Sequence, residues 1–274
     1  MREIQLEELK QIELELLKQF IEICNKLNLR YSMGGGSLLG AVRHHGFIPW
    51  DDDIDVNLPR PDYEKFIHYC ENNELKFKLV CSENNEKYLD LSAKIYNPNT
   101  VLIDKETNLE DYDCGVHIDI FPIDGLGMTL QDAKLSFYKS EFPKELLVAK
   151  SWKHFFISKT HAWYYEPFRY FMFILSRIFS GKKLIKLFKH LCLSHNFDEM
   201  NYSGCLCGAY RLKEILPTSV FREIIKISFE GILVNAYKEY DTYLSSLFGD
   251  YMVLPPEGKR LSHHTFKAYF LDEE

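Results

Sequence analysis

An acidic run that leads into an apolar strand constrains this sequence more than any other feature. Residues 34–58 read GGGSLLGAVRHHGFIPWDDDIDVNL, and a strand is predicted for residues 54–58. The aspartates before and inside that strand are Asp51, Asp52, Asp53 and Asp55. Because side chains at i and i+2 of a strand share one face, Asp53 and Asp55 are expected to lie side by side. Two such carboxylates repel each other unless a cation lies between them, and hard oxygen ligands suit Mg²⁺ or Mn²⁺. A solvated acidic turn is the alternative interpretation.

A glycine-rich segment precedes the aspartates. Gly34, Gly35, Gly36 and Ser37 stand between a strand expected for residues 31–33 and a helix expected for residues 38–44. Such a loop lets backbone N–H groups approach an anion closely, and the helix N-terminus adds a partial positive charge. Ser37 can cap the helix or donate its hydroxyl to a phosphate oxygen. The segment is also compatible with an ordinary turn, and it is neither a Walker loop nor a complete G-x-G-x-x-G.

A third carboxylate stands in a second apolar strand, predicted for residues 116–121. In the segment GVHIDIFPID, His117 and Asp119 share one face, and an unpaired charge there would be costly. Asp124, next to Gly125, is interpreted as a turn or cap residue. An anion-binding loop, a D-x-D strand and a further carboxylate together indicate metal-assisted phosphoryl transfer.

Hydrophobic periodicity predicts an α+β fold. Apolar side chains at three- and four-residue steps indicate an amphipathic helix over residues 4–27. Further strands are expected at 78–81, 89–96 and 101–103, and a β-like stretch at 225–234. Further helices are expected from Pro61 onward and over 130–150, 164–179, 182–196 and 238–248. An αβ half followed by a largely helical half predicts a mixed sheet flanked by helices. We expect a single domain over residues 1–274, with a core in 1–125 and a helical, C-terminal substrate-binding part in 126–274.

Charge and cysteine content exclude several classes of partner and location. The 33 Lys and Arg against 40 Asp and Glu give a net charge of −7, which disfavours nucleic acid as a general partner. The N-terminus lacks the features of a secretory signal, and no uncharged apolar stretch is long enough to predict a membrane span. The seven cysteines are scattered and odd in number, so reduced thiols and a cytoplasmic location are expected.

The combined motifs closely resemble the LicD family. They are GGGSLLGAVRHHGFIPWDDDIDV, GVHIDIFPID, and FGDYMVLPPEGKR with a His pair downstream. The LicD group is related to fukutin and fukutin-related protein and belongs to the polymerase-β-like nucleotidyltransferase superfamily. The resemblance runs from the N-terminal helix to about residue 264 and is weakest across 130–215. It implies a LicD-like domain with a short, nucleotidyltransferase-like mixed sheet, which assigns the catalytic core to residues 1–125.

The resemblance also implies an activity. LicD-like proteins transfer phosphocholine from CDP-choline to a sugar hydroxyl of a bacterial surface polysaccharide, of teichoic acid or lipopolysaccharide type, or of its lipid-linked precursor. CMP is released, and relatives use other CDP-alcohols such as CDP-ribitol. The match makes Gly36 and Ser37 the donor phosphate loop and Asp53 and Asp55 the Mg²⁺ or Mn²⁺ pair. It makes Asp119 the third carboxylate, a further metal ligand and the base. The departure is an extra glycine, GGGS in place of GS. Nucleotidyl transfer and a non-catalytic scaffold remain alternatives.

Cationic and aromatic residues around the motifs supply candidate substrate contacts. Arg43 and His44 can bind the donor phosphates, because guanidinium groups bind phosphate oxygens bidentately. Trp50 and Tyr31 can hold the choline ammonium against an aromatic face, although either residue can equally belong to the core.

The C-terminal segment adds Arg260, His263 and His264, which can reach the donor phosphates or simply lie on a surface. The helix candidate 163–179 (WYYEPFRYFMFILSRIF) is typical of peripheral membrane contact, which a lipid-linked acceptor would favour, but a buried core helix reads similarly.

A Cys and His group further along the chain raises the question of zinc. Its members are His190, Cys192, His195, Cys205 and Cys207. They lack the paired C-x₂-C spacing of common structural sites, so buried thiols and surface imidazoles are the simpler interpretation.

Overall fold

The computed structural model describes residues 1–82, 84–85, 87–104, 114–158, 162–260 and 266–271. Its α-helices are α1 (Leu6–Leu27), α2 (Gly35–His44), α3 (Arg60–Glu71), α4 (Leu130–Ser151), α5 (Glu166–Ile178), α6 (Gly181–Cys192) and α7 (Tyr240–Phe248). Its strands are β1 (Arg2–Glu3), β2 (Ser32–Met33), β3 (Asp55–Pro59), β4 (Lys78–Val80), β5 (Ala93–Tyr96), β6 (Thr100–Ile103), β7 (His117–Gly127), β8 (Tyr202–Gly204), β9 (Leu216–Pro217), β10 (Ile224–Phe229), β11 (Ile232–Tyr237) and β12 (Lys267–Phe270).

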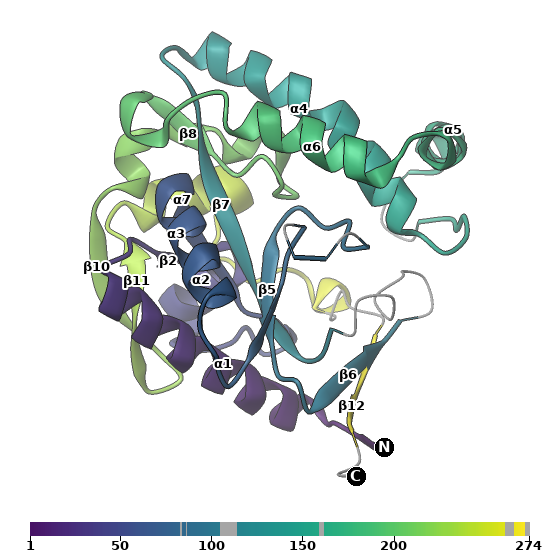
Figure 1. Cartoon of the computed structure of the whole chain (residues 1–274). Helices are drawn as coiled ribbons and strands as arrows, with labels where there is room; N and C mark the ends of the chain where they lie inside the picture. The colour runs from purple at the N-terminus through teal and green to yellow at the C-terminus, as the bar shows by residue number, and fades with distance from the viewer. Residues whose placement is uncertain (83, 86, 105–113, 159–161, 261–265, 272–274) are drawn as a thin grey trace.

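A mixed sheet in the order β2-β3-β7-β5-β4 forms the centre of the molecule (Figure 1). The strands β3 and β7 run parallel, while β2, β5 and β4 join the sheet antiparallel. The far end of the long strand β7 pairs with β8, and a separate small sheet has the order β1-β12-β6. The predicted α+β fold with a mixed sheet flanked by helices is therefore confirmed.

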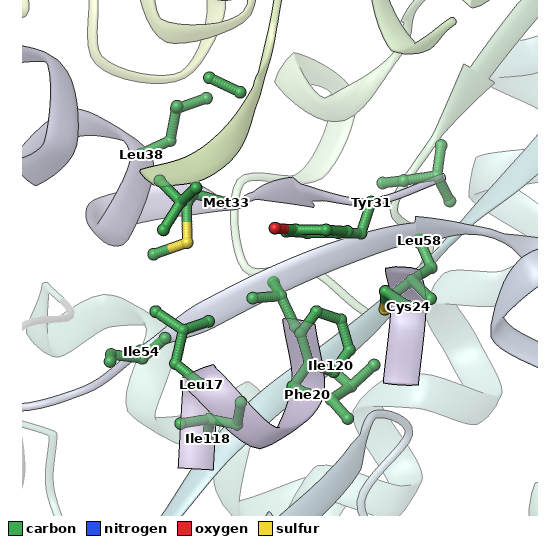
Figure 2. Packing of buried hydrophobic residues seen from close by; sticks show 14 of the residues in the cluster. Leu17, Phe20, Cys24, Tyr31, Met33, Leu38, Ile54, Leu58, Ile118 and Ile120 are labelled. Atoms are coloured by element: carbon green, nitrogen blue, oxygen red, sulfur yellow. The ribbon is translucent and has the colours of Figure 1, made fainter. Parts of the chain in front are cut away.

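Helix α1 supplies the apolar cover of one sheet face, as its periodicity predicts. Leu17 and Phe20 are fully buried and lie against Ile118 and Ile120 of β7 (Figure 2). The helix ends at Asn28, whose left-handed backbone (φ 52°) closes the last turn. Burial of such side chains contributes about 2–3 kcal/mol each before entropy is counted.

Two local expectations were wrong, namely the glycine-rich loop and the single β-like stretch at 225–234. The glycine-rich segment is not a loop before a helix, because α2 begins at Gly35 and takes Gly36 and Ser37 into its first turn. Gly35 has φ +41°, a backbone conformation that glycine adopts without a Cβ penalty.

The β-like stretch 225–234 is a hairpin, β10–β11, rather than one strand. Phe229 pairs with Ile232, so the turn consists of Glu230 and Gly231, both with positive φ. That pair of conformations is the tight turn that matches the twist of two antiparallel strands. The C-terminal strand β12 was not expected either.

The second half of the chain contributes to two hydrophobic clusters. Helices α4, α5 and α6 pack together around a cluster that includes Leu126 of β7. The hairpin β10–β11 and helix α7 instead join the main core with α1 and the sheet. Both clusters therefore draw on the central sheet, and the division at residue 125 stays a prediction.

Asp124 is a buried partner of an arginine and not the expected turn or cap residue. It lies in β7, fully buried, where it accepts hydrogen bonds from Arg60 Nε (2.6 Å) and Nη2 (3.1 Å). Arg60 opens α3 directly after β3. The bidentate pair thus ties the β3–α3 junction to β7.

We predict that Arg60→Met lowers the free energy of unfolding by about 3–5 kcal/mol, because it leaves the Asp124 carboxylate buried without its cation. Urea unfolding followed by circular dichroism measures this. The matched control is Lys238→Met, which breaks the exposed Lys238–Glu223 pair (2.6 Å) and should cost less than about 1 kcal/mol. Equal losses in the two variants would contradict the structural role of the pair.

Candidate active site

The parallel register of β3 and β7 brings two carboxylates together. Asp55 pairs with Asp119, and the next pair on the same face is Asn57 with Phe121. The N–H of Asp119 donates to the carbonyl of Ile54 (2.9 Å), which fixes this register. The two aspartates predicted from separate motifs therefore lie on adjacent strands at the same height.

Ser37 holds the acidic segment in place through its hydroxyl. Its Oγ accepts a hydrogen bond from the N–H of Asp55 (2.8 Å) and donates to the carbonyl of Asp53 (3.4 Å). The serine predicted to bind phosphate is thus a positioning residue for both aspartates in this structure. It lies in the first turn of α2, so that helix N-terminus and the aspartates are fixed relative to one another.

The glycines of the same turn leave room for the carboxylates. A Cβ on Gly35 would lie 3.0 Å from Oδ2 of Asp55, and a Cβ on Gly36 would lie 2.9 Å from Oδ2 of Asp51. A larger residue would push these side chains away from the helix N-terminus. Because that end of a helix carries a partial positive charge, the close approach stabilises the aspartates.

Crowding of negative charge dominates the electrostatics of Asp55. Burial, together with the charges of Asp53 and Asp119, raises the pKa of Asp55 well above its ordinary value, and the nearby Lys94 acts in the opposite direction. Carboxylates that raise one another's pKa in this way form a place where a cation is stabilised.

Asp119 interacts with Lys94 and Ser92, which the sequence motifs did not reveal, and with His117, which strand alternation places on the same face. Its Oδ1 accepts from the ammonium of the buried Lys94 and from the hydroxyl of Ser92 (3.1 Å), and Oδ2 lies 3.4 Å from Nε2 of His117. Although burial acts to raise it, Lys94 and His117 hold the pKa of Asp119 well below its ordinary value. Asp119 is therefore ionised throughout the neutral range.

A further carboxylate reaches the acidic segment from α1. Glu13 is 3% exposed, and its Oε2 has no hydrogen-bond partner among the described residues. Together with Asp53 and Asp119 it borders a cavity of about 10 Å³, room for one water-sized sphere. Burial and the surrounding aspartates raise the pKa of Glu13 well above its ordinary value. The sequence offered one signal, since Glu13 occupies an apolar-face position four residues from Leu9 and Leu17.

The donor chemistry of this site fits a hard divalent cation, because Asp53 and Asp55 supply carboxylate oxygens close enough to repel each other. Within the described residues, however, no three His, Cys, Asp or Glu side chains are placed to hold a metal ion. Asp119 is turned toward Lys94 instead, so Asp53 and Asp55 are the candidate ligands.

The Cys and His residues considered for zinc form no group of three that could hold a metal ion in the part of the chain that the structure describes. Cys192 is buried at the end of α6, whereas His190 is exposed on the same helix. Cys205 and Cys207 lie 3.5 Å apart between their sulfur atoms.

Four predicted substrate contacts form one cluster beside the start of the acidic run. Arg43 donates from Nη1 to the carbonyl of Tyr251 (2.6 Å) and from Nε to His44 (2.9 Å). His44 meets the edge of Trp50, and the guanidinium of Arg260 lies 5.7 Å from the centre of the Trp50 ring. The structure therefore places two cationic side chains around Trp50, which immediately precedes Asp51.

Tyr31 belongs to the core and not to a substrate pocket. It is 1% exposed, its ring meets Phe20 edge-on at 5.2 Å, and its hydroxyl accepts from the N–H of Asn235 (Figure 2). The predicted contacts His263 and His264 lie outside the described residues.

We predict that Ser37→Ala lowers both stability and turnover, because it leaves the N–H of Asp55 without its acceptor. An unsatisfied buried donor costs about 1–3 kcal/mol, which urea unfolding would measure. Ser246→Ala is the matched control, because Ser246 donates to the carbonyl of Lys213 (2.7 Å) at an exposed position of α7 and should cost no more than about 0.5 kcal/mol. Unchanged stability and turnover in Ser37→Ala would remove the positioning role.

Comparisons with known proteins show which family and which relatives this chain resembles. Residues 28–157 match the family described as LicD/FKTN/FKRP, nucleotidyltransferase domain. The lipopolysaccharide cholinephosphotransferase LicD of Haemophilus influenzae is 28% identical over 99% of this chain and 100% of its own length. The ribitol 5-phosphate transferase FKRP of Mus musculus is 28% identical over 119 residues, which cover 35% of this chain and 22% of FKRP. The chain is therefore similar to the LicD family in its domain at residues 28–157, and to one LicD protein along almost its whole length.

Proposed function

We propose that this chain transfers phosphocholine from CDP-choline to a sugar hydroxyl of a bacterial cell-surface polysaccharide or its lipid-linked precursor. Similarity to a lipopolysaccharide cholinephosphotransferase over the full length of both chains supports the phosphotransferase class and the choline donor. The observation that carries the proposal is the pairing of Asp55 with Asp119 beside the N-terminus of α2. An acidic pair next to an anion-binding helix end suits a donor whose phosphates arrive with a divalent cation.

In the proposed reaction the acceptor hydroxyl attacks the phosphorus that carries choline. A new P–O bond forms to the sugar, the P–O bond to CMP breaks, and CMP leaves. Asp119 receives the proton of the hydroxyl, and Lys94 keeps Asp119 ionised, as a base must be. The same ammonium of Lys94 makes Asp119 a weaker base. It also helps Asp119 to release the proton after the transfer.

The cation we assign to Asp53 and Asp55 is Mg²⁺, with Mn²⁺ as its substitute. When bound there, it would neutralise phosphate oxygens of the donor and charge on the departing CMP. The guanidinium groups of Arg43 and Arg260, in the cluster with His44 and Trp50, are the proposed partners of the diphosphate, since guanidinium groups bind phosphate oxygens bidentately.

Asp53→Asn and Asp55→Asn should each reduce turnover by several orders of magnitude, because each removes a charge from the proposed cation site. The measurement is CMP released from CDP-choline with Mg²⁺ and an acceptor glycan, alongside pyrophosphate released from CTP. Asp250→Asn, at an exposed position, is the control and should retain activity. Retained turnover in either site variant would contradict the cation assignment, and pyrophosphate without CMP would indicate nucleotidyl transfer instead.

Helix α5 supports the further proposal that the protein contacts a membrane surface. Its apolar side chains are largely exposed, among them Phe168, Phe171 and Ile178, which excludes the buried-core alternative. Arg177, near the end of α5, and Lys182, just beyond it, add positive charge toward anionic lipid. In Figure 1 α5 lies at the outer end of the α4–α6 layer. No helix of the described residues is long and apolar enough to cross a membrane.

We predict that Phe168→Ser combined with Phe171→Ser abolishes co-sedimentation with anionic liposomes without lowering the melting temperature. Both side chains are more than half exposed, whereas Phe173 stacks on Trp152 and is left intact. Leu233→Ser, on the exposed side of the β10–β11 hairpin, is the control. Undiminished liposome binding by the double variant would contradict membrane contact through α5.

A further inference from the structure

A cavity of about 160 Å³ opens beside the carboxylate pair and combines aromatic with acidic side chains. The side chains that define it are Asp55, Asn57, Phe121, Tyr210, Glu214 and Tyr243. They come from β3, β7, the short helix Arg211–Glu214 with its preceding residue, and α7, so the cavity unites distant parts of the chain. The sequence analysis predicted no substrate contact for Phe121, Tyr210, Glu214 or Tyr243, and the last three lie outside the motifs.

The register of the sheet fixes the distance between this cavity and the reacting centre. Asn57 and Phe121 form the pair that follows Asp55 and Asp119 on the same face. Two residues along a strand correspond to about 7 Å. Phosphocholine separates its phosphate from its ammonium by an ester oxygen and two carbons, a spacer of comparable length. A phosphate at the aspartate pair therefore directs its alcohol into the cavity.

Charge in the cavity favours a cation. Glu214 is 4% exposed, and its Oε1 accepts from the N–H of Tyr210 (3.2 Å). Burial raises the pKa of Glu214 to about 7, against the effects of that hydrogen bond and of Lys144. A carboxylate desolvated in this way is stabilised by a positive ligand. The ammonium of Lys144 itself donates to the carbonyl of Gly208 (2.5 Å).

The aromatic rings are fixed by their own hydrogen bonds and packing. The hydroxyl of Tyr243 accepts from the N–H of Gly35 (3.2 Å) and the side-chain amide of Asn57 (3.1 Å). Tyr210 packs edge-on against Phe248 at 5.1 Å and is 36% exposed, which places it at the mouth of the cavity. Rigid aromatic faces beside a carboxylate attract quaternary ammonium groups, which need no hydrogen-bond acceptors.

We propose that this cavity is the subsite for the quaternary ammonium of the donor, enclosed by Tyr210, Phe121 and Tyr243 and neutralised by Glu214. This inference rests on the proposed function and assigns the residues that distinguish choline from uncharged alcohols. A polyol such as ribitol would meet aromatic faces where its hydroxyls need polar partners, so it should bind less tightly.

The test compares dissociation constants of CDP-choline, CDP-ribitol and CMP, measured by calorimetry with Mg²⁺ for the full chain and two variants. Tyr210→Leu and Glu214→Gln should each weaken CDP-choline binding at least tenfold and leave CMP binding within twofold. Tyr138→Leu and Glu71→Gln, at exposed positions of α4 and α3, are matched controls that should change neither. Should Glu214→Gln fail to fold, Tyr210→Leu at the rim decides alone.

Each other outcome is decisive. Equal weakening of CDP-choline and CMP would assign the cavity to the cytosine or to structural support, and it would overturn the proposal. Unchanged CDP-choline binding in both variants would overturn it as well, while the proposed function would stand. Failure of the unmodified chain to bind CDP-choline, with CMP still bound, would instead overturn the proposed function itself.

Discussion

The structure is organised around the repulsion between carboxylates that the β3–β7 pairing forces together. A parallel pair with Asp55 opposite Asp119 places two negative charges in a largely buried setting. Such an arrangement opposes folding unless other groups offset the charge. Lys94 does so from the neighbouring strand β5, where the antiparallel register sets it directly opposite Asp119. The N-terminus of α2 offsets the charge of Asp55, and Ser37 fixes the distance between that helix end and Asp55.

Glu13 adds to this repulsion and does not relieve it. Its buried carboxyl group borders the same acidic cavity, and burial together with the surrounding aspartates raises its pKa well above the ordinary value. A sequence selected only for stability would place an apolar residue at this position of α1. Residues that lower stability in this way are found mainly at functional sites, where a side chain is kept for its function although it does not suit its buried position.

The sequence predicted the parts of the site that depend on local periodicity, and it missed the parts that depend on long-range contacts. Period-two alternation predicts the strand face on which Asp119 lies. The parallel register of β3 and β7 then places Asp119 next to Asp55. Lys94 and Glu214 belong to no motif. Only the folded structure brings Lys94 of β5 next to Asp119 and Glu214, which precedes β9, to the cavity beside Asp55. Tyr31 was misassigned as a ligand contact because an aromatic residue next to a glycine-rich motif looks the same whether it is buried or exposed. The glycine segment was read as an anion-binding loop because glycines let backbone N–H groups approach an anion, whereas its glycines lie in the first turn of α2 next to Asp55 and Asp51.

The small β1-β12-β6 sheet has a consequence for synthesis of the protein. Leu9, from the first turns of α1, and Phe266, just before β12, both border the acidic cavity. The strand β12 lies between β1 and β6, so residues near both ends of the described chain close one wall. During translation the aspartates emerge early, but this wall is incomplete until synthesis has passed residue 270. The acidic cavity is therefore completed well after its principal aspartates have been synthesised.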